Sequence, residues 1–471
     1  MSDAADVYVV GSGPNGLTAA VMLAMAGRRV HVLEAAATPG GGMRTQELIE
    51  AGTRHDVCSA IHPLGVASRA LRDLPLGDHG LEWVWPDIEV ANVVAGGAGL
   101  LYRDLDATAV ALGADGARWQ AAMRPLLAGG VDLIDMLLAP LALPRHPLHL
   151  ARYGLAGIQP ATRWGRRFAT DAGGGLFAGL AAHAILPLDR PITTGYGLML
   201  GMLGHLVGWP LPRGGSQAIA DALVSLLRAH GGTIECGVAV SSLGELPPGA
   251  TAVLDVTPRQ LLAMAGDRLP ARYAARLARY RYGPAVFKLD YVLSDPIPWR
   301  SPEARRAGTV HVGGGLAEIA AAEAAVAAGR HPERPFLLVA QPTQFDATRS
   351  STGRHVAWTY CHVPNGSTVD MTDRIEAQIE RFAPGFRDTI VGRHTLGPAA
   401  LEAYNANYVG GDIAAGAGDL RQFVARPVLA RHPWRTPLDG VYLCSAATAP
   451  GAGVHGMCGY HAARTVLADR R

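Results

Sequence analysis

Lysine is almost absent from this chain. Lys288 is the only lysine in 471 residues, so arginine carries nearly all of the positive charge, which we attribute first to compositional bias. The formal net charge is only +2. Proteins that bind nucleic acid through their overall charge are more basic, so this balance predicts no nucleic-acid partner. The length is sufficient for two domains with an ample core.

Cysteines are few, odd in number and scattered. None forms a Cys-x-x-Cys pair, and their positions are Cys58, Cys236, Cys361, Cys444 and Cys458. This pattern is typical of a reducing compartment without disulfides, and it disfavours dithiol chemistry. The sequence also lacks a metal-ligand spacing, a Ser/His/Asp order and a Walker loop. No metal is therefore expected, and hydrolase and kinase functions are disfavoured.

No apolar run reaches the ~20 residues that a membrane-spanning helix needs. The nearest candidates, Leu126–Leu143 and Leu198–Leu211, are interrupted by polar residues, glycine or proline. We interpret them as core helices, with tunnel walls or helices dipping into a membrane surface as alternatives. A strand is predicted within about six residues of the N-terminus, which leaves no room for a signal peptide. We expect a cytoplasmic protein, with peripheral membrane contact left open.

The first 44 residues hold the most specific pattern. An apolar stretch after Asp6 leads to Gly11, Gly13 and Gly16, and a helix rich in Ala and Leu is predicted over Leu17–Ala26. In such a motif the first glycine makes a tight turn and the second lets backbone approach a pyrophosphate. The third lets the helix pack closely on the sheet. The N–H groups and dipole at the helix start attract the phosphates.

An acid and a second glycine cluster indicate which dinucleotide is bound. Glu34 lies 18 residues after Gly16, at the end of a predicted strand, where its carboxylate can accept from ribose hydroxyls and repel a 2′-phosphate. The following Gly40-Gly41-Gly42-Met43-Arg44 adds backbone donors and a cation for the pyrophosphate. NAD sites do not need that second cluster, so the sequence predicts FAD.

The remaining pattern alternates helical and strand blocks. Helices are predicted from about 75 to 205, and Ser216 is a plausible N-cap for the helix that follows it. Predicted strands and one further helix follow at 233–236, 238–243, 252–256, 286–293, 356–363 and 372–382. The segment beginning at His311 contains three glycines, but it lacks the motif spacing and a following acid. A second nucleotide site is therefore disfavoured.

Three blocks together resemble the phytoene desaturase-related FAD oxidoreductases. They are the N-terminal motif with its second glycine cluster, the Pro212-Arg-Gly-Gly-Ser block leading to Val240, and the Gly-rich tail over 440–459. This branch of the flavoprotein superfamily also holds carotenoid isomerases, retinol saturase and, further off, monoamine oxidases. The resemblance covers essentially the whole chain, and its motifs are specific for the superfamily rather than for a substrate.

The resemblance implies an α/β fold with a Rossmann-like FAD-binding domain of the glutathione-reductase type. An α+β substrate domain would be formed by two inserts. The FAD-binding domain would be discontinuous, built from residues 1–72, 209–268 and 425–471. The substrate domain would take residues 73–208 and 269–424.

The resemblance also implies which residues hold FAD. The motif residues are Gly11, Gly13, Pro14, Asn15, Gly16, Glu34, Gly41, Gly42, Met43 and Arg44. The adenine would meet the backbone of Val240, with Thr257 nearby. The tail would wrap the cofactor through Ser445, Ala446, Val454, His455, Gly456 and Met457. Neither cysteine of the tail sits where amine oxidases attach flavin, so the predicted FAD is non-covalent.

Three side chains are candidates for the chemistry. Flavin enzymes ask the protein for orientation, a dry pocket and one base. His62 follows the glycine cluster and could accept a proton or align the substrate. Lys288 lies on a strand similar to the amine-oxidase strand whose lysine holds a water near flavin N5. His455 could form a hydrogen bond to the flavin.

The sequence thus predicts an FAD-dependent oxidoreductase that moves a hydride from, or to, a C–C bond of an apolar small molecule, with oxygen or a quinone as electron acceptor. A flavin-dependent isomerase or saturase is one alternative. An amine oxidase is another, disfavoured because aromatic residues make up only 6% of the chain and do not cluster in the sequence. A non-catalytic flavin-bearing protein is the third. The oligomeric state is left open.

Overall fold

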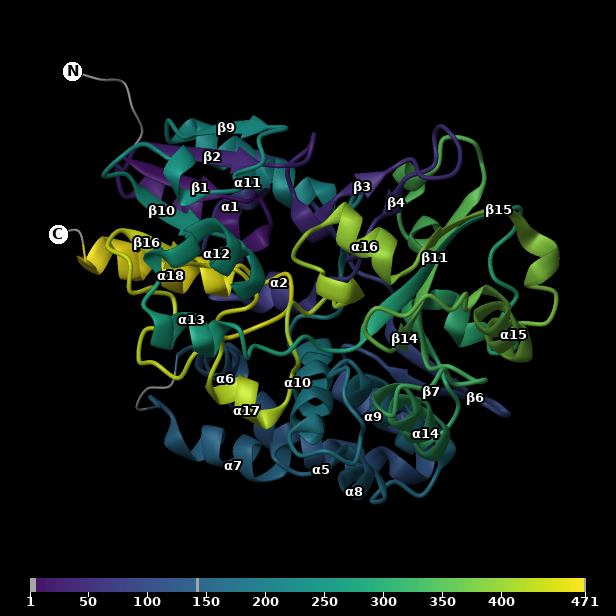
Figure 1. The fold of residues 1–471 in the computed structure, drawn as a ribbon. Coiled ribbons are helices and arrows are strands. Elements are labelled where there is room, and N and C mark those ends of the chain that lie inside the picture. The colour runs from purple at the N-terminus through teal and green to yellow at the C-terminus, as the bar shows by residue number, and fades with distance from the viewer. Residues whose placement is uncertain (1–5, 141–143, 470–471) are drawn as a thin grey trace.

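The first of two large sheets is parallel and carries the N-terminal motif. The computed structural model describes residues 6–140 and 144–469. The strand order is β16-β10-β1-β2-β9, and every neighbouring pair is parallel. The strands are β1 (Val7–Val10), β2 (Val30–Glu34), β9 (Thr233–Cys236), β10 (Thr251–Leu254) and β16 (Val441–Leu443). Segments from the beginning, middle and end of the chain thus lie side by side, at the upper left of Figure 1.

Helices cover both faces of this sheet. Val9 and Val253 pack into a core with α1 (Pro14–Met25), α11 (Gln217–Ala229) and α18 (Met457–Asp469). Val10 and Leu254 point the opposite way, into a core with α12 (Pro258–Ala265) and α13 (Ala271–Leu277). Alternate strand residues therefore serve opposite faces, as buried parallel strands require.

The second sheet is mixed and has seven strands, in the order β15-β11-β14-β13-β12-β6-β7. Neighbours are antiparallel except for β12 and β6, which are parallel. The strands are β6 (Ile88–Val94), β7 (Gly97–Leu101), β11 (Ala285–Leu293), β12 (Ala307–Val312), β13 (Leu337–Ala340), β14 (His355–Val363) and β15 (Ile390–Leu396). One face packs on α15 (Thr372–Phe382).

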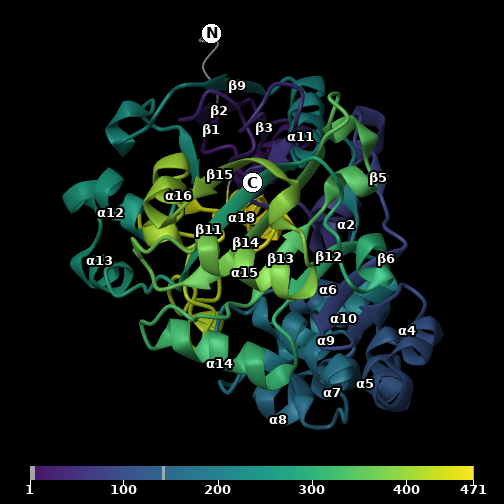
Figure 2. The ribbon, with the colours of Figure 1, turned by 90° about the vertical axis from the view of Figure 1, so that its right-hand side faces the viewer.

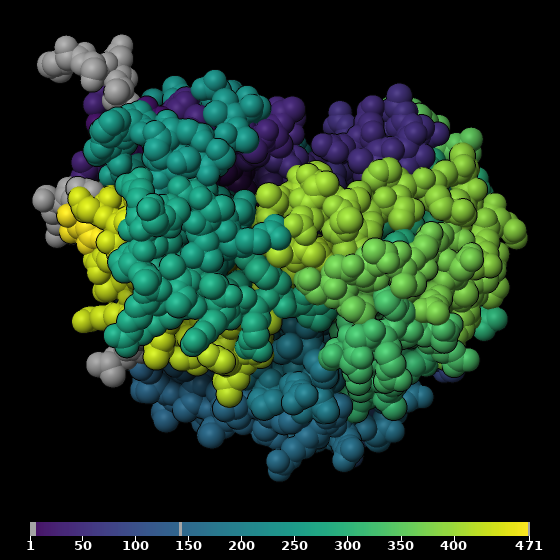
Figure 3. Space-filling model, viewed as in Figure 1, coloured from purple at the N-terminus to yellow at the C-terminus, as the bar shows by residue number. Residues whose placement is uncertain are grey.

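The other face of the second sheet packs on a helical layer. That layer, blue in Figures 1 and 2, lies below both sheets, and it forms the bottom of the surface in Figure 3. Its helices are α4 (Leu105–Leu112), α5 (Gly116–Leu127), α6 (Gly130–Leu137), α7 (Pro147–Gly157), α8 (Ala161–Gly165), α9 (Asp171–Ala182) and α10 (Thr193–Leu206). Leu176 and Leu203 of this layer share a core with Trp358 of the sheet. The core is almost entirely apolar, so the layer can wall a dry chamber.

Further elements connect or flank these blocks. They are β3 (Thr45–Gln46), β4 (His55–Asp56), α2 (Pro63–Ala67), α3 (Arg69–Arg72), β5 (Trp83–Val84), β8 (Leu211–Pro212), α14 (Leu316–Ala327), α16 (Pro398–Tyr404) and α17 (Leu420–Val424). The strands β3 and β4 pair with each other, and β5 pairs with β8.

Two local expectations are wrong. Ser216 precedes α11, but its side chain does not cap the helix, because its hydroxyl donates to the Ser59 carbonyl at 2.7 Å. The segment 238–243 forms no strand. Instead the Val238 N–H donates to the Glu34 carbonyl at 2.9 Å, so the chain crosses the end of β2.

The apolar stretches at 126–143 and 198–211 form helices only in part. The first contains the end of α5 and all of α6, while residues 141–143 lie outside the described residues. The second contains the largely buried C-terminal part of α10 and the first residue of the short β8. No helix among the described residues is both long enough and apolar enough to cross a bilayer.

Candidate functional site

The glycine turn sits where β1 meets α1. Gly11 has a φ of +95°, which an L side chain rarely adopts, and Gly13 is the N-cap of α1. A Cβ on Gly16 would lie 2.1 Å from the Gly11 carbonyl oxygen, so only glycine fits. A Cβ on Gly41 would lie 2.9 Å from the Gly13 Cα. The two glycine clusters therefore face each other, leaving backbone within reach of a ligand.

Glu34 is buried at the end of β2 and holds both clusters together. One carboxylate oxygen accepts from the Ser12 N–H at 2.8 Å and from the Ser12 hydroxyl at 2.5 Å. The other accepts from the Ala36 N–H at 2.9 Å and from Arg44 Nη2 at 3.0 Å. The Arg44 guanidinium also lies 5.3 Å from the Tyr404 ring centroid. Glu34 and Arg44 thus form one buried ion pair beside the turn.

Asp255 is the acid that the sequence reasoning missed. It follows β10, and its carboxylate accepts from the Gly16 N–H at 3.0 Å. Burial raises the pKa of Asp255 to about 6, with the nearby Glu34 charge acting in the same direction and the Gly16 hydrogen bond opposing it. The signal available in the sequence was an acid directly after an apolar stretch, at the carboxyl end of a strand beside β1.

The residues expected around the adenine and pyrophosphate lie at the ends of neighbouring strands. Val240 is half-buried, two residues beyond the Val238 N–H that bonds β2. Thr257 is buried and forms a capping box at the start of α12. Ser445 donates to the Val256 carbonyl at 2.7 Å, and the Ala446 carbonyl accepts from Arg426 Nε at 2.8 Å. The roles of these four residues toward a cofactor stay predictions.

The tail turn over 450–457 lies against the start of α1. A Cβ on Gly456, whose φ is +66°, would lie 2.4 Å from the Thr18 hydroxyl. His455 is 1% exposed, and its Nδ1 accepts from the Met457 N–H at 3.0 Å, at the start of α18. Burial lowers the pKa of His455 to about 4, so the ring is neutral at pH 7. Val454 and His455 both line the cavity described below, which leaves Met457 buried behind them.

His62 is also buried and neutral. Ser216 donates its only proton to the Ser59 carbonyl, so His62 Nε2 must be the donor in its 2.7 Å contact with the Ser216 hydroxyl. That arrangement leaves His62 Nδ1 as an unprotonated acceptor, and no partner lies within hydrogen-bond distance of it among the described residues. Burial lowers the pKa of His62 to about 4. With that low pKa the neutral ring is a weak base at pH 7, so proton transfer to His62 stays a prediction.

Lys288 lies behind the cavity wall rather than in it. On β11 it forms a buried ion pair with Asp290, two residues along the strand. Its ammonium lies 5.7 Å from the Trp358 ring centroid, and Trp358 itself faces the cavity. The cavity lining does not include Lys288. The expected contact with a flavin-bound water therefore stays a prediction, and Asp290 is the partner that the sequence reasoning missed.

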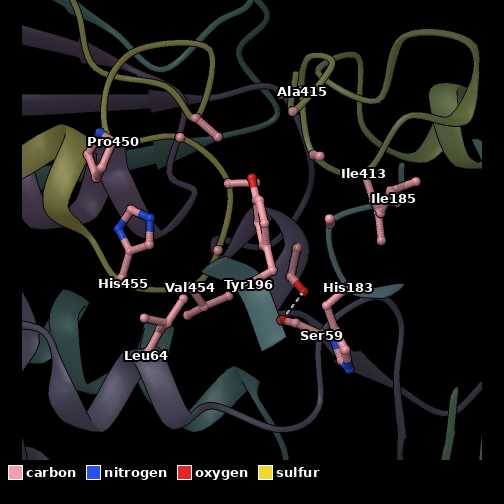
Figure 4. Close-up of a pocket in the computed structure, with 18 of the residues that line it drawn as sticks. Ser59, Leu64, His183, Ile185, Tyr196, Ile413, Ala415, Pro450, Val454 and His455 are labelled. Atoms are coloured by element: carbon pink, nitrogen blue, oxygen red, sulfur yellow. Dashed lines mark hydrogen bonds between the residues drawn. The ribbon is translucent and has the colours of Figure 1, made fainter. Parts of the chain in front are cut away.

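One continuous cavity of about 590 Å³ extends from the glycine turn to the helical layer, where α7 and α10 line it. Gly13, Asn15 and Gly41 line its first end, and Tyr153, Ile158 and Phe423 line the other. Figure 4 shows Tyr196 between the tail turn, with Val454 and His455, and the opposite wall of Ile185, Ile413 and Ala415. We refer to the part of the cavity on the far side of Tyr196 from the glycine turn as the apolar chamber. The cavity thus joins the dinucleotide motif to an apolar space.

Aromatic rings do cluster, contrary to the expectation from the sequence. Trp358 and Tyr360 stack in the cavity wall with centroids 5.5 Å apart at 19°. Trp209 also lines the cavity, with its ring 5.5 Å from that of His183. These residues are distant in sequence, and the alternation of side chains on β14 places two of them on one face. The fold, not the composition, makes the cluster.

His183 is the polar group within this aromatic wall. Its partner is His311 of β12, which is 128 residues away in the chain, and the two Nε2 atoms are 3.1 Å apart. Burial lowers the pKa of His183 to about 3, so one neutral ring donates and the other accepts. Among the described residues, no group of three or more His, Cys, Asp or Glu side chains is arranged to hold a metal ion.

Comparisons with known proteins agree with this fold. Residues 9–74 match the family model of the NAD(P)-binding Rossmann-like domain. The rat pyridine nucleotide-disulfide oxidoreductase domain-containing protein 2 is 26% identical, over 98% of this chain and 93% of its own length. An uncharacterized protein of Mycobacterium tuberculosis is 25% identical, over 98% of this chain and 97% of its own.

Solved structures cover the whole fold. A Methanosarcina mazei oxidoreductase superposes with a TM-score of 0.67 at 16% identity, covering 98% of this chain and 99% of its own. A putrescine oxidase studied for redesign of cofactor binding gives 0.63 at 19% identity, covering 99% of both chains. At these identities the likeness concerns the fold. The chain therefore has the α/β architecture of these oxidoreductases, with a Rossmann-like NAD(P)-binding domain at its N-terminus.

Proposed function

We propose that this protein is an FAD-dependent oxidoreductase that transfers a hydride between a C–C bond of an apolar small molecule and its cofactor, as a relative of the phytoene desaturase-related enzymes. One observation carries the proposal: a single cavity joins the glycine turn to the apolar chamber. A substrate in the chamber would reach a dinucleotide seated on the turn without crossing water.

The residues at the glycine turn suit FAD. The start of α1 offers backbone donors and a positive dipole end, and Asn15 Oδ1 is buried there with no partner among the described residues. Non-covalent attachment is supported by Cys458, whose thiol is buried and directed at the Thr448 and Gly451 carbonyls. When bound, FAD would supply a two-electron acceptor.

The chain's own residues would orient the substrate and manage one proton. The stacked Trp358 and Tyr360 would hold a flat or extended apolar molecule and exclude water. His62 Nδ1 would take the proton that leaves the neighbouring substrate carbon as the hydride leaves the first. His455 and Lys288 would fix the surroundings of the ring, with Asp290 balancing the lysine charge. Oxygen or a quinone would be the final acceptor.

Amine oxidation is the second candidate, and the stacked Trp358–Tyr360 pair favours it. Against it stands the cavity's charge. The acids that line the described cavity are Asp255 and Asp412, and both already accept from backbone N–H groups. Neither is free to bind an ammonium group at the far end of the chamber. An apolar substrate therefore fits better than a diamine.

The test begins with the visible spectrum of the purified protein, kept anaerobic. We expect a bound flavin that is released intact by heat denaturation, since it is non-covalent. Separate samples then receive NADH or NADPH, a hydroaromatic compound or partly saturated polyene, or a monoamine. Bleaching by the apolar compound alone supports a desaturase. Bleaching by a nicotinamide favours the saturase or isomerase. Bleaching by a monoamine but not by the hydrocarbon supports the amine oxidase.

A protein that binds FAD but is bleached by none of these compounds, and whose flavin resists small redox dyes, would be a flavin-bearing binding protein. A chain that binds no flavin after incubation with FAD would overturn the proposal. The variant Asp412→Asn tests the argument against amines. It removes the charge of a cavity carboxylate that, in our proposal, only accepts hydrogen bonds from backbone N–H groups. It is expected to leave selectivity between the two substrate classes unchanged.

A further inference from the structure

Helix α7 exposes an apolar face. Leu148 and Leu155 are 74% and 75% exposed, and Ile158, directly after the helix, is 52% exposed. Together with Ala151, which is also exposed, they recur every three or four residues, so they form one stripe along the helix. A surface helix of a soluble protein normally turns such a stripe inward. Here the apolar stripe faces outward.

Helix α17 repeats this feature from a distant part of the chain. Leu420, Phe423 and Val424 are 42%, 52% and 43% exposed, and their spacing again puts them on one side of the helix. The two helices lie one above the other at the lower left of Figure 1. Exposed apolar stripes of this kind mark a site of interaction.

Both helices border the same opening. Tyr153 of α7 donates to the Gly195 carbonyl of α10 at 2.9 Å. The next residue, Tyr196, has its hydroxyl 3.2 Å from where a Cβ on Gly418 would lie, just before α17. Ile158 and Phe423 line the cavity and are exposed at the same time, so the chamber opens between the two helices. We define the rim of this opening as Leu148, Leu155, Ile158, Leu420, Phe423 and Val424.

Basic side chains predominate around the rim, and the exposed acid beside it, Asp132 of α6, lies 3.7 Å from His146 at the start of α7. No Asp or Glu occurs between Asp135 and Asp171, nor between Asp419 and Asp439, and both stretches contain several arginines. Arg145, Arg152 and Arg421 are exposed, and none of them has an ion-pair partner among the described residues. The acids nearest in sequence are engaged: Asp135 pairs with Arg69 and Arg72, and Asp419 with Arg281. The rim is therefore apolar with a basic border.

We propose that this rim docks on an anionic lipid bilayer, with its apolar side chains among the acyl chains and its arginines at the lipid phosphates. Apolar side chains flanked by arginine suit the boundary between headgroups and acyl chains, and arginines near an anionic surface add attraction. Because the chamber opens through the rim, a lipid-dissolved substrate passes into the chamber directly. This last point rests on the proposed function, whereas docking does not.

The experiment is vesicle flotation of the full-length protein without substrate. Vesicles of phosphatidylcholine are compared with vesicles that also contain phosphatidylglycerol. We expect binding to the anionic vesicles and roughly tenfold weaker binding to the neutral ones, with the difference reduced by salt. Leu155→Ser combined with Phe423→Ser is expected to weaken binding to both vesicle types by about tenfold or more. Arg145→Gln combined with Arg152→Gln is expected to reduce only the preference for anionic lipid.

The matched control is Val110→Ser. Val110 is 81% exposed on α4 and is absent from the cavity lining, so its loss is expected to leave binding unchanged. Circular dichroism and light scattering accompany each variant. The proposal is overturned if the protein stays in solution with both vesicle types, if the rim variant binds as well as the control, or if the rim variant instead splits a dimer. If the protein binds vesicles but cannot bind flavin, the docking proposal is supported and the proposed function is contradicted.

Discussion

The two ends of the cavity are built in different ways. At the glycine turn, the ligand-facing groups are backbone atoms, exposed because Gly13 and Gly41 approach each other without side chains. In the apolar chamber they are side chains from α7, α10, α17 and β14, held by contacts between distant segments. Backbone donors can face a ligand only where the glycines allow this one chain geometry, whereas substitution can replace the side chains of the chamber. The first end therefore fixes what kind of cofactor can bind, and the second fixes the substrate.

The largest effect is expected at the turn. Gly16→Val would place a Cβ 2.1 Å from the Gly11 carbonyl oxygen, where the backbone cannot yield. We expect the loss of flavin binding and a destabilisation of about 3 kcal/mol or more, measured by flavin content and chemical denaturation. Gly77→Ala is the control, since a Cβ there meets no atom within 4 Å. A valine variant that binds flavin normally would show that the close approach is not required.

Arg349 is buried beside β4 and is not part of the cavity lining. Its guanidinium pairs with Asp56 at 2.6 Å and with Asp346 at 3.3 Å, and all three side chains are fully buried. Arg349→Met leaves the buried Asp56 without a cation and Asp346 with only the 4.0 Å contact to Arg213, so we expect a loss of about 3–5 kcal/mol in the free energy of unfolding. Arg306→Met, which breaks an exposed pair with Asp87, should cost less than about 1 kcal/mol. Equal losses would mean that the buried cluster adds nothing.

The same cluster gives an acid-sensitive stability. Burial alone would raise the pKa of Asp56, but the charge and hydrogen bond of Arg349 outweigh burial and lower it below 3.8. The resulting stabilisation is present above pH 3.8 and is lost as the pH falls through the folded-state pKa. Without Arg349 the pKa of Asp56 should rise, so the variant should lose stability with increasing pH over the acidic range. Denaturation midpoints measured across that range test the reversal.

Asp255 sets a smaller, pH-dependent effect on cofactor affinity. Burial raises the pKa of Asp255 to about 6, so above pH 6 its carboxylate is charged beside the N-terminus of α1. A dinucleotide pyrophosphate would be repelled by that charge, so we expect FAD affinity to fall as the pH rises through about 6. Asp255→Asn should bind FAD about tenfold more tightly at pH 8 and lose the dependence. Titration of the apoprotein by flavin fluorescence measures both, and a flat wild-type profile would contradict the argument.

The smallest effect is expected in the chamber. His183→Phe keeps a ring against Trp209 but removes the 3.1 Å contact with His311. Flavin content should not change, and stability should fall by about 1 kcal/mol. KM for an apolar substrate should shift while kcat changes little. His331→Gln is the control, because His331 bonds Ser367 outside the cavity. A loss of flavin in the His183 variant would contradict the separation of the two ends.

The same contrast explains what could be predicted from the sequence. The strand at Thr233–Cys236 and the helix at Thr372–Phe382 have the predicted bounds, because a local apolar period specifies each. The glycine turn was also recognisable, since its spacing encodes its geometry. The segment 238–243 was not, because its apolar residues pack against the sheet without pairing.

Side-chain partnerships across the chain were beyond the sequence. Nothing near His183 indicates His311, and the stack of Trp358 on Tyr360 depends on which face of β14 meets the helical layer. The sequence predicts a helix cap at Ser216, yet its side chain bonds Ser59 and His62, because β4 and α11 come together only in the folded protein. Local spacing carries backbone geometry, whereas the chamber depends on contacts of high sequence separation.

The strand order of the first sheet has a consequence for synthesis. β10 lies between β1 and β16, and α1 packs against α18. The segment synthesised first is therefore completed by the segment synthesised last. At about 5–20 residues per second, α1 waits tens of seconds on the ribosome before α18 exists. During that interval one apolar side of α1 lacks its partner. A chain that terminates before its last elements would therefore leave β10 as an open sheet edge and one side of α1 uncovered.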